Sequence, residues 1–282
     1  MATLKQIRRR IRSIQSTMQI TKAMQMVAAA KLRRAQSRAL ATRPYVTAMQ
    51  ASLARVAAAV PAGAHPLLAA RPSGRTLLLV IASDKGLCGS FNSHILAAAE
   101  HRLDAPGPEV LCMPVGRRAV RYFQYRRRPI WRAVERLGDQ IDFDLVRDLG
   151  RLAVDTFISG EVARVEALHY RFITTARREM ILDRLIPIAP ETEDHHARQY
   201  LFEPDAASVL ATLLPRFITT RLLAMLADSL ASEHSARMLA MGNATRSAQD
   251  MVGELTLKAN KLRQATITRE LIDIVGGSAV GE

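Results

Sequence analysis

The residues best suited to chemistry lie in one short loop, SDKGLCGSFN at 83–92. The loop follows an apolar run typical of a strand and opens a stretch typical of a helix, which is where phosphate-binding loops occur. It lacks the Gly-Lys-Ser/Thr ending of a P-loop and the three spaced glycines of a dinucleotide-binding turn. We therefore expect Gly86 and Gly89 to serve a turn and close packing, and we predict no cofactor.

The other reactive side chains are scattered. EDHH at 193–196 lies in a polar stretch without the spacing of metal ligands, which indicates a solvated loop. Cys88 and Cys112 are too few and too widely spaced for a disulfide framework or a zinc site, so both are interpreted as reduced thiols. His234 is interpreted as a packed polar residue. With no paired carboxylates, nucleophile elbow or triad, the chain has no predicted catalytic residue or metal site and is not predicted to be an enzyme by itself.

The elements around these groups are unusual, because the first sixty residues carry an apolar repeat at alternating spacings of three and four. This heptad pattern predicts a coiled-coil helix over 1–60. Pro44 lies inside it, where the loss of one backbone hydrogen bond can kink the helix. Its seam consists of Leu4, Ile7, Ile11, Ile14, Met18, Thr21, Gln25, Ala28, Leu32, Ala35, Ala39, Thr42, Val46, Met49, Leu53, Val56 and Val60.

The C-terminal segment repeats the pattern over 205–276, with Asp205 as the predicted N-cap. The two helices are predicted to pair antiparallel, with facing residue numbers that sum to about 265, give or take two turns. The second seam consists of Leu210, Leu213, Phe217, Thr220, Ala224, Ala227, Ala231, His234, Met238, Met241, Thr245, Ala248, Val252, Leu255, Ala259 and Leu262.

The middle of the chain, 74–190, alternates strand-like and helix-like runs and closes with a hairpin. It predicts a small α/β (Rossmann-like) sheet domain. Linkers are expected at 61–74 and 189–199. The predicted fold is therefore α/β: a long antiparallel two-helix coiled coil, formed by 1–60 and 205–282 as a shaft, plus this central domain.

The net charge of +14 belongs entirely to the N-terminal segment. The first acidic residue is Asp84, and 14 Lys or Arg precede it; after it, 26 basic and 26 acidic residues cancel. Such a block indicates a solvated face, a polyanion-binding arm or an acidic protein partner. Nucleic-acid binding is an alternative, but no aromatic residue precedes Tyr45 and no reader module is evident. No uninterrupted apolar run reaches the roughly 20 residues of a membrane span, so no membrane insertion is expected.

Four ordered strings resemble the gamma subunit family of F-type ATP synthases. They are ITKAMQMVAAAKLRRAQ at 20–36, SDKGLCGSFN at 83–92, YLFEPD at 200–205 and LRQATITRELIDIVGGSAV at 262–280. The resemblance covers essentially the whole chain. It implies a central rotor shaft that couples ion-driven rotation of a membrane ring to conformational cycling of catalytic beta subunits.

The resemblance also implies partners and contact residues. The partners are the alpha and beta subunits as a hexamer, the epsilon subunit and the membrane c-ring, at the cytoplasmic face of a bacterial inner membrane. Beta-subunit loops would meet Lys22, Met24, Arg263 and Gln264. The ring would face Tyr200, Phe202 and Glu203, and an apolar collar would hold Ile267, Leu271, Ile274 and Val275 at the tip of the C-terminal helix.

Two alternatives remain open from the residues alone. The first is a free-standing basic coiled coil that binds nucleic acid, whose affinity for bare DNA would fall linearly with salt on logarithmic axes. The second is an α/β enzyme that uses the 83–92 loop, which would require the isolated chain to bind nucleotide.

Overall fold

The computed structural model describes residues 3–61, 63–189 and 200–278. Two long helices, α1 (Leu4–Ala58) and α5 (Ala206–Ser278), begin and end the described chain. The chain divides into two compact units. Unit 1 comprises Met1–Val27 and Met238–Glu282, and unit 2 comprises Ala28–Arg237. Each unit therefore contains part of both helices.

The predicted heptad seams are confirmed by burial. Every predicted seam residue of α1, and every one of α5 from Leu210 to Leu262, is buried or half-buried. Most side chains of α1 off the seam are exposed, as expected for a helix that packs along one stripe. Helix α1 continues through Pro44, and α5 continues through Pro215, a proline that the sequence analysis did not consider.

The antiparallel register is confirmed in each unit. In unit 1, the hydroxyl groups of Thr21 and Thr245 lie 2.8 Å apart. In unit 2, Arg43 Nη2 lies 3.4 Å from Asp228 Oδ1. In each pair the two residue numbers add up to a value that differs from the predicted 265 by no more than the residues of two helical turns. Asp205 caps α5 as predicted, since its Oδ1 accepts a 2.9 Å hydrogen bond from the Ser208 amide.

Unit 2 also contains a four-stranded sheet in the order β2-β1-β3-β4. Strands β2, β1 and β3 are parallel, and β4 returns antiparallel to β3 as the predicted hairpin. The strands are β1 (Thr76–Ile81), β2 (Val110–Val115), β3 (Arg164–Phe172) and β4 (Arg178–Ile186). The connections carry η1 (Pro66–Leu68), α2 (Phe91–Leu103), α3 (Arg117–Tyr125) and α4 (Phe143–Ile158).

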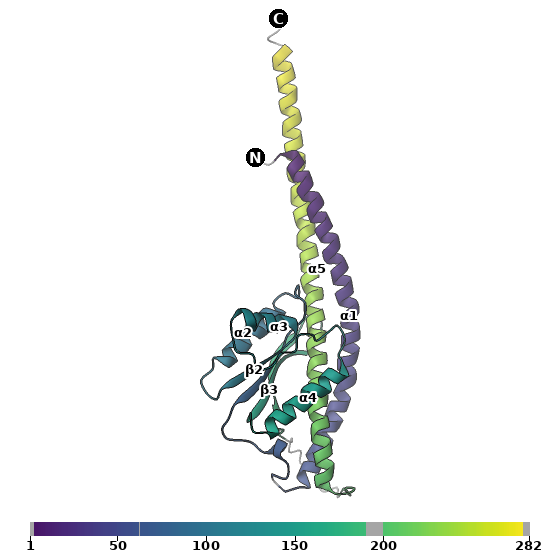
Figure 1. Ribbon diagram of the computed structural model, residues 1–282. Coiled ribbons are helices and arrows are strands. Elements are labelled where there is room, and N and C mark those ends of the chain that lie inside the picture. The colour runs from purple at the N-terminus through teal and green to yellow at the C-terminus, as the bar shows by residue number, and fades with distance from the viewer. Residues whose placement is uncertain (1–2, 62, 190–199, 279–282) are drawn as a thin grey trace. The chain divides into compact units, whose positions relative to one another are not determined.

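Both faces of this sheet are covered by helices of unit 2 (Figure 1). One face packs against α4 and the unit 2 parts of α1 and α5, and the other packs against α2 and α3. All six residues of β1 are buried, which explains their uninterrupted apolar run. The stretch 61–74, predicted as a linker, partly joins this core, because Leu67 is fully buried.

Helix α5 is apolar enough in one 18-residue window within Ala206–Arg269 to cross a membrane by length and composition alone, with a mean hydropathy of 1.5. In the structure 44% of that window is buried inside the protein. A helix that packs in a protein core passes the same test, so the window is weak support for a membrane span.

Candidate functional site

The loop 83–92 lies where α/β proteins usually bind ligands. In an open sheet that site is the crevice at the carboxyl ends of the strands where the strand order reverses. In this sheet the reversal falls at β1 and β3, so the crevice lies between the loop after β1 and the loop after β3. Helix α5 crosses it, because its side chains bond to both loops.

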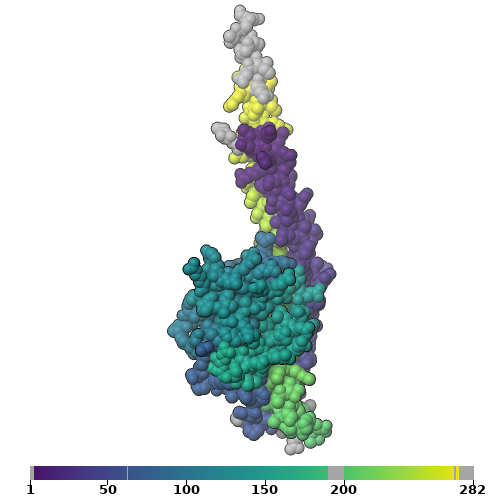
Figure 2. Space-filling model, viewed as in Figure 1, coloured from purple at the N-terminus to yellow at the C-terminus, as the bar shows by residue number. Residues whose placement is uncertain are grey.

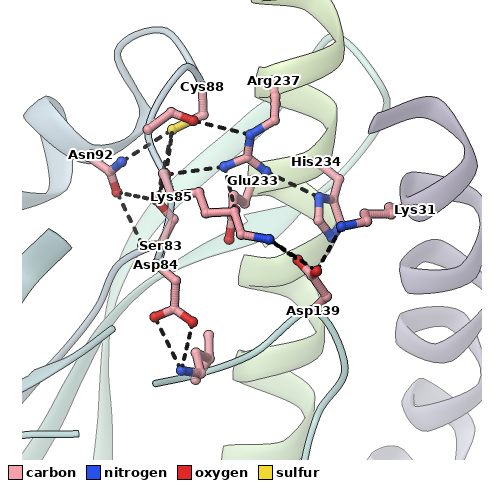
Figure 3. Close-up of polar contacts among 12 residues, drawn as sticks. Lys31, Ser83, Asp84, Lys85, Cys88, Asn92, Asp139, Glu233, His234 and Arg237 are labelled. Carbon is pink, nitrogen blue, oxygen red and sulfur yellow. Dashed lines mark hydrogen bonds and ion pairs between the residues drawn. The ribbon is translucent and has the colours of Figure 1, made fainter. Parts of the chain in front are cut away.

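Arg237 of α5 contacts the 83–92 loop at this crevice (Figure 3). Its Nε donates to the Gly86 carbonyl at 3.2 Å, and its Nη2 donates to the Lys85 carbonyl at 3.1 Å. Ser235 donates from its hydroxyl to the carbonyl of Thr175 in the opposite loop. The 83–92 loop therefore presents carbonyl oxygens to a cation, whereas a phosphate-binding loop presents amide N–H groups to an anion.

Arg237 forms a buried ion pair with Glu233, one helical turn earlier, at 2.6 Å (Figure 3). Only about a tenth of each side chain is exposed. Burial raises the pKa of Glu233, and the charge of Arg237 opposes that shift. The neighbouring His234 is also buried, and burial together with Arg237 and Lys31 lowers its pKa to about 4. His234 is therefore neutral near pH 7, and it is packed at the seam as the sequence predicted.

A second ion-pair group joins α1 to the same region of unit 2 (Figure 3). Asp139 Oδ2 lies 2.7 Å from Lys31 Nζ of α1 and 3.2 Å from Lys85 Nζ. The hydrogen bond from Lys31 lowers the pKa of Asp139. About a third or more of each of the three side chains is exposed. We therefore expect each ion pair to contribute less than about 1 kcal/mol to the free energy of unfolding.

Asp84 has a structural role that accounts for its place in the loop. Its carboxylate accepts hydrogen bonds of 2.9–3.2 Å from the amides of Arg117, Leu137 and Gly138. It therefore ties the start of α3 to the segment before Asp139. The carboxylate of Asp84 is therefore engaged in holding the two loops together.

Neither cysteine is suited to nucleophilic chemistry. Both are free thiols, as predicted, and both are also buried. Burial raises the pKa of the Cys88 thiol, and it raises the pKa of Cys112 to about 12. Thiolates are the reactive form, so both side chains behave as packed apolar groups. Among the described residues no group of three or more His, Cys, Asp or Glu side chains is arranged to hold a metal ion; EDHH at 193–196 lies outside them.

This geometry predicts that the chain alone does not bind nucleotide at the 83–92 loop. Isothermal titration with ATP or ADP at millimolar concentration should show no saturable heat, because the loop presents carbonyl groups and Arg237 already binds those of Lys85 and Gly86. Lys85→Ala serves as the control. Saturable binding that this substitution abolishes would contradict the structural reading and restore the enzyme alternative.

The predicted contact residues of unit 1 fall at two separate levels. Lys22 is exposed and Met24 is half-buried, while Arg263 and Gln264 are both exposed. The Thr21–Thr245 pair fixes the register, so Met24 lies at the level of Gly242. Arg263 is therefore about 30 Å farther along the axis at 1.5 Å per residue. The structure does not bring the two pairs together, and each pair would need its own partner segment.

Among the described residues of unit 1, no other helix lies beside the end of α5 (Figures 1 and 2). After Leu262 every described side chain is exposed. Ile267 and Leu271 are 48% and 57% exposed, and Ile272, which the sequence analysis did not select, is 64% exposed. Ile274 and Val275 belong to α5, but their side chains lie outside the described residues.

Sequence reasoning missed a second set of exposed apolar side chains in unit 1. These residues lie off the seam, where a helix that only packs against α1 or α5 would carry polar groups. Their exposed fractions range from 48% to 68%. The signal was present as apolar residues outside the heptad: Ile20, Met26, Val27, Met251 and Leu257.

The predicted ring-facing residues lie just before α5 in unit 2. Tyr200 is 44% exposed, its ring centroid lies 6.5 Å from that of Phe202, and the guanidinium of Arg55 lies 5.6 Å from its centre. Phe202 is half-buried against the core and Glu203 is exposed. Leu201 is 99% exposed, which leaves a large apolar side chain uncovered between the two rings.

Comparisons with known proteins agree over the whole chain. A family model described as ATP synthase matches residues 3–280. The chain is 40% identical to an ATP synthase gamma chain from Pelotomaculum thermopropionicum and 41% identical to one from Desulforamulus reducens, over 100% of both chains in each case. The fold is similar to a chain of the Euglena gracilis mitochondrial ATP synthase (OSCP/F1/c-ring) structure, with a TM-score of 0.67, 14% identity and coverage of 98% and 94%. It is also similar to a chain of the Tetrahymena thermophila ATP synthase central stalk/c-ring structure, with a TM-score of 0.61, 24% identity and coverage of 80% and 99%.

Proposed function

The chain belongs to the ATP synthase gamma chain family, and from that premise we propose that it is the non-catalytic rotor shaft of the enzyme. In this role ion flow turns a membrane ring, the ring turns the shaft, and the shaft presents different surfaces in turn to three catalytic sites. A shaft changes those sites only if it contacts their conformational states with different free energies. We propose that the exposed side chains of unit 1 supply that difference.

The observation that carries this proposal is the surface of unit 1. Its two helices pair by small and apolar seam residues, yet Ile20, Met26 and Leu257 remain exposed off the seam. A free coiled coil would expose a polar surface instead. Partner subunits that surround the pair would cover these side chains, which supports a shaft enclosed by other chains.

We assign the catalytic-subunit contacts to two levels of the shaft. Lys22 and Met24 form the lower level, and Arg263 and Gln264 form the upper one. The exposed positive charge of Lys22 and Arg263 suits acidic loops of beta subunits. At the tip, Ile267, Leu271, Ile274 and Val275 would lie in an apolar collar formed by alpha and beta subunits. Apolar contact is non-directional, so such a collar holds the tip without fixing its angle.

We assign the ring contact to Tyr200, Phe202 and Glu203, together with the exposed Leu201. Torque applied there enters α5 directly, because Asp205 caps the helix only two residues after Glu203. Arg237 and Ser235 then fasten the sheet of unit 2 to the same helix. The sheet and the unit 2 part of α5, Ala206 to Arg237, are therefore expected to turn as one body.

The remaining partners follow from the same assignment. We propose that an epsilon subunit binds the shaft and that the complex lies at the cytoplasmic face of a bacterial inner membrane, to which this chain is attached through its partners. The relatives and the fold favour the rotor, and neither favours the nucleic-acid alternative.

Purification of the native complex tests this function. A tag on this chain should recover alpha and beta subunits in three copies each per copy of the chain, together with ATPase activity. Recovery of the chain with nucleic acid and without nucleotide-binding subunits would contradict the proposal. An affinity for bare DNA that falls linearly with salt on logarithmic axes would support the alternative instead.

A further inference from the structure

An open groove of about 400 Å³ lies in unit 2 between helix α3 and residues 135–136. We call it the arginine groove. Three arginines and one glutamate line it, which leaves a formal charge of +2 from its lining side chains. The lining residues are Arg117, Val120, Arg121, Gln124, Glu135 and Arg136.

The arginines of this groove have no counterion among the described residues. The segment 117–136 contains eight arginines and one acidic residue. Two of these arginines, Arg126 and Arg128, form ion pairs of 2.8 and 2.6 Å with carboxylates at the end of α2. The three arginines that line the groove, in contrast, form no hydrogen bond or ion pair with any residue that the structure describes.

The arginines line the groove from both of its walls. Arg117 and Arg121 are four residues apart on α3, so their side chains lie on one face of the helix, one turn apart. Arg136 belongs to the opposite wall, and both it and Arg121 are exposed. Guanidinium groups without a counterion attract carboxylates, which match their planar fork of donors.

The groove lacks the parts that bind a single phosphate or a nucleic acid base. Phosphate sites direct backbone amides at the ligand, but the nearby amides of Arg117, Leu137 and Gly138 already donate to the carboxylate of Asp84. None of the described residues that line the groove is aromatic, so a base finds no ring there on which to stack. These features favour a ligand whose carboxylates are spread along a chain.

The spacing of the arginines fits an extended peptide. Arg117 and Arg121 are separated by about 6 Å along α3, at 1.5 Å per residue. Alternate side chains of an extended chain lie on the same face about 7 Å apart. We propose that the arginine groove binds an extended acidic segment of a partner protein, with carboxylates of alternate residues on Arg117 and Arg121. None of the residues assigned above to the ring or to the catalytic subunits lines this groove, so the site goes beyond those contacts.

Fluorescence anisotropy of a labelled peptide in which glutamate and serine alternate tests the inference on the full chain. Saturable binding is expected. Arg117→Gln combined with Arg121→Gln should weaken it about tenfold, because each exposed ion pair that is lost changes affinity roughly threefold. Absence of saturable binding to the native chain would overturn the proposal.

Arg8→Gln combined with Arg12→Gln is the matched control. It removes two exposed arginines at the same spacing from α1 in unit 1, so it should leave the affinity nearly unchanged. Equal weakening by both double variants would show general attraction to a basic chain and would overturn the proposal. If the Arg117→Gln and Arg121→Gln double variant loses its native circular dichroism, the exposed single variant Arg121→Gln decides against Arg8→Gln.

Competition experiments test the class of ligand. Free glutamate and inorganic phosphate should displace the peptide poorly, and displacement by either at the concentration of unlabelled peptide would contradict an extended ligand. A peptide of the same composition with its glutamates adjacent at one end should bind more weakly, and equal binding would contradict the proposed spacing. A short single-stranded DNA oligonucleotide that binds more tightly than the peptide, and loses affinity in Arg117→Gln combined with Arg121→Gln, would make the groove a nucleic-acid site instead.

Discussion

Replacing Arg237 with methionine should lower the free energy of unfolding by about 3–5 kcal/mol, the usual cost of removing one partner from a buried ion pair. Arg237 is the counterion of Glu233 and the donor to the Lys85 and Gly86 carbonyls, and all of these groups lie inside unit 2. The substitution leaves a buried carboxylate without a counterion. Urea unfolding followed by circular dichroism measures the change.

Two further variants separate the ion pair from general packing. Glu233→Gln combined with Arg237→Met removes the lone charge, so it should recover a large part of the loss. Arg216→Met removes an exposed arginine of α5 in the same unit. Its free energy of unfolding should stay within about 0.5 kcal/mol of that of the native chain. A double variant as unstable as Arg237→Met would show that the charge of Glu233 is not the cause.

The pH dependence of Arg237→Met gives a second readout. Burial raises the pKa of Glu233 above its ordinary value of 4.5, so the folded chain binds a proton more readily than the unfolded chain. The contribution of Glu233 to the free energy of unfolding is therefore greatest at low pH, and it is lost as the pH rises above 4.5. Without Arg237 the pKa should rise further. The cost of the substitution should consequently be smaller at pH 5 than at pH 8, and an equal cost at both would contradict this account.

Deleting residues 271–282 should weaken assembly and lower the ATPase rate severalfold, while each ATP hydrolysed still drives the same ion transport. Ile267 and Leu271 are exposed in unit 1, and apolar contact with a collar centres the tip without fixing its angle. The turning force would act at Met24 and Arg263, which the deletion retains.

ATP-driven ion uptake in vesicles, divided by ATP hydrolysed, measures this effect. An unchanged ratio at a reduced rate supports the tip as a bearing. A ratio that collapses while hydrolysis continues would show that the tip transmits force. Leu271→Ser in the full-length chain is a milder control, and we expect it to lower the rate less than the deletion and to leave the ratio unchanged.

The long elements were predictable because each has its own periodicity. The seam from Leu4 to Val56 and the buried run of β1 follow from local spacing of apolar residues, and the N-cap Asp205 follows from its residue type at the start of the second repeat. The antiparallel register followed from matching the two seams and their ends. Pro215 shows where such reasoning weakens, because tertiary packing holds α5 continuous through a residue that usually interrupts a helix.

The polar contacts inside unit 2 were not predictable in the same way. Glu233 and Arg237 are four residues apart, so their pairing was readable from the helix, but their burial depends on how α5 crosses the sheet. The sequence predicted only packing for His234. Asp84 gave no signal of its role, since its partners at 117 and 137–138 are distant in sequence.

Rotation of this chain inside its complex tests the central claim most directly. Leu201→Cys introduces an exposed thiol, whereas Cys88 and Cys112 are buried and should react slowly with maleimides. A visible bead attached there, on a complex without the membrane ring and fixed through its beta subunits, reports the angle of the shaft. The account predicts continuous rotation in one direction when ATP is added, at a rate set by hydrolysis. A bead that stays still or only fluctuates while ATP is hydrolysed at the normal rate would contradict it.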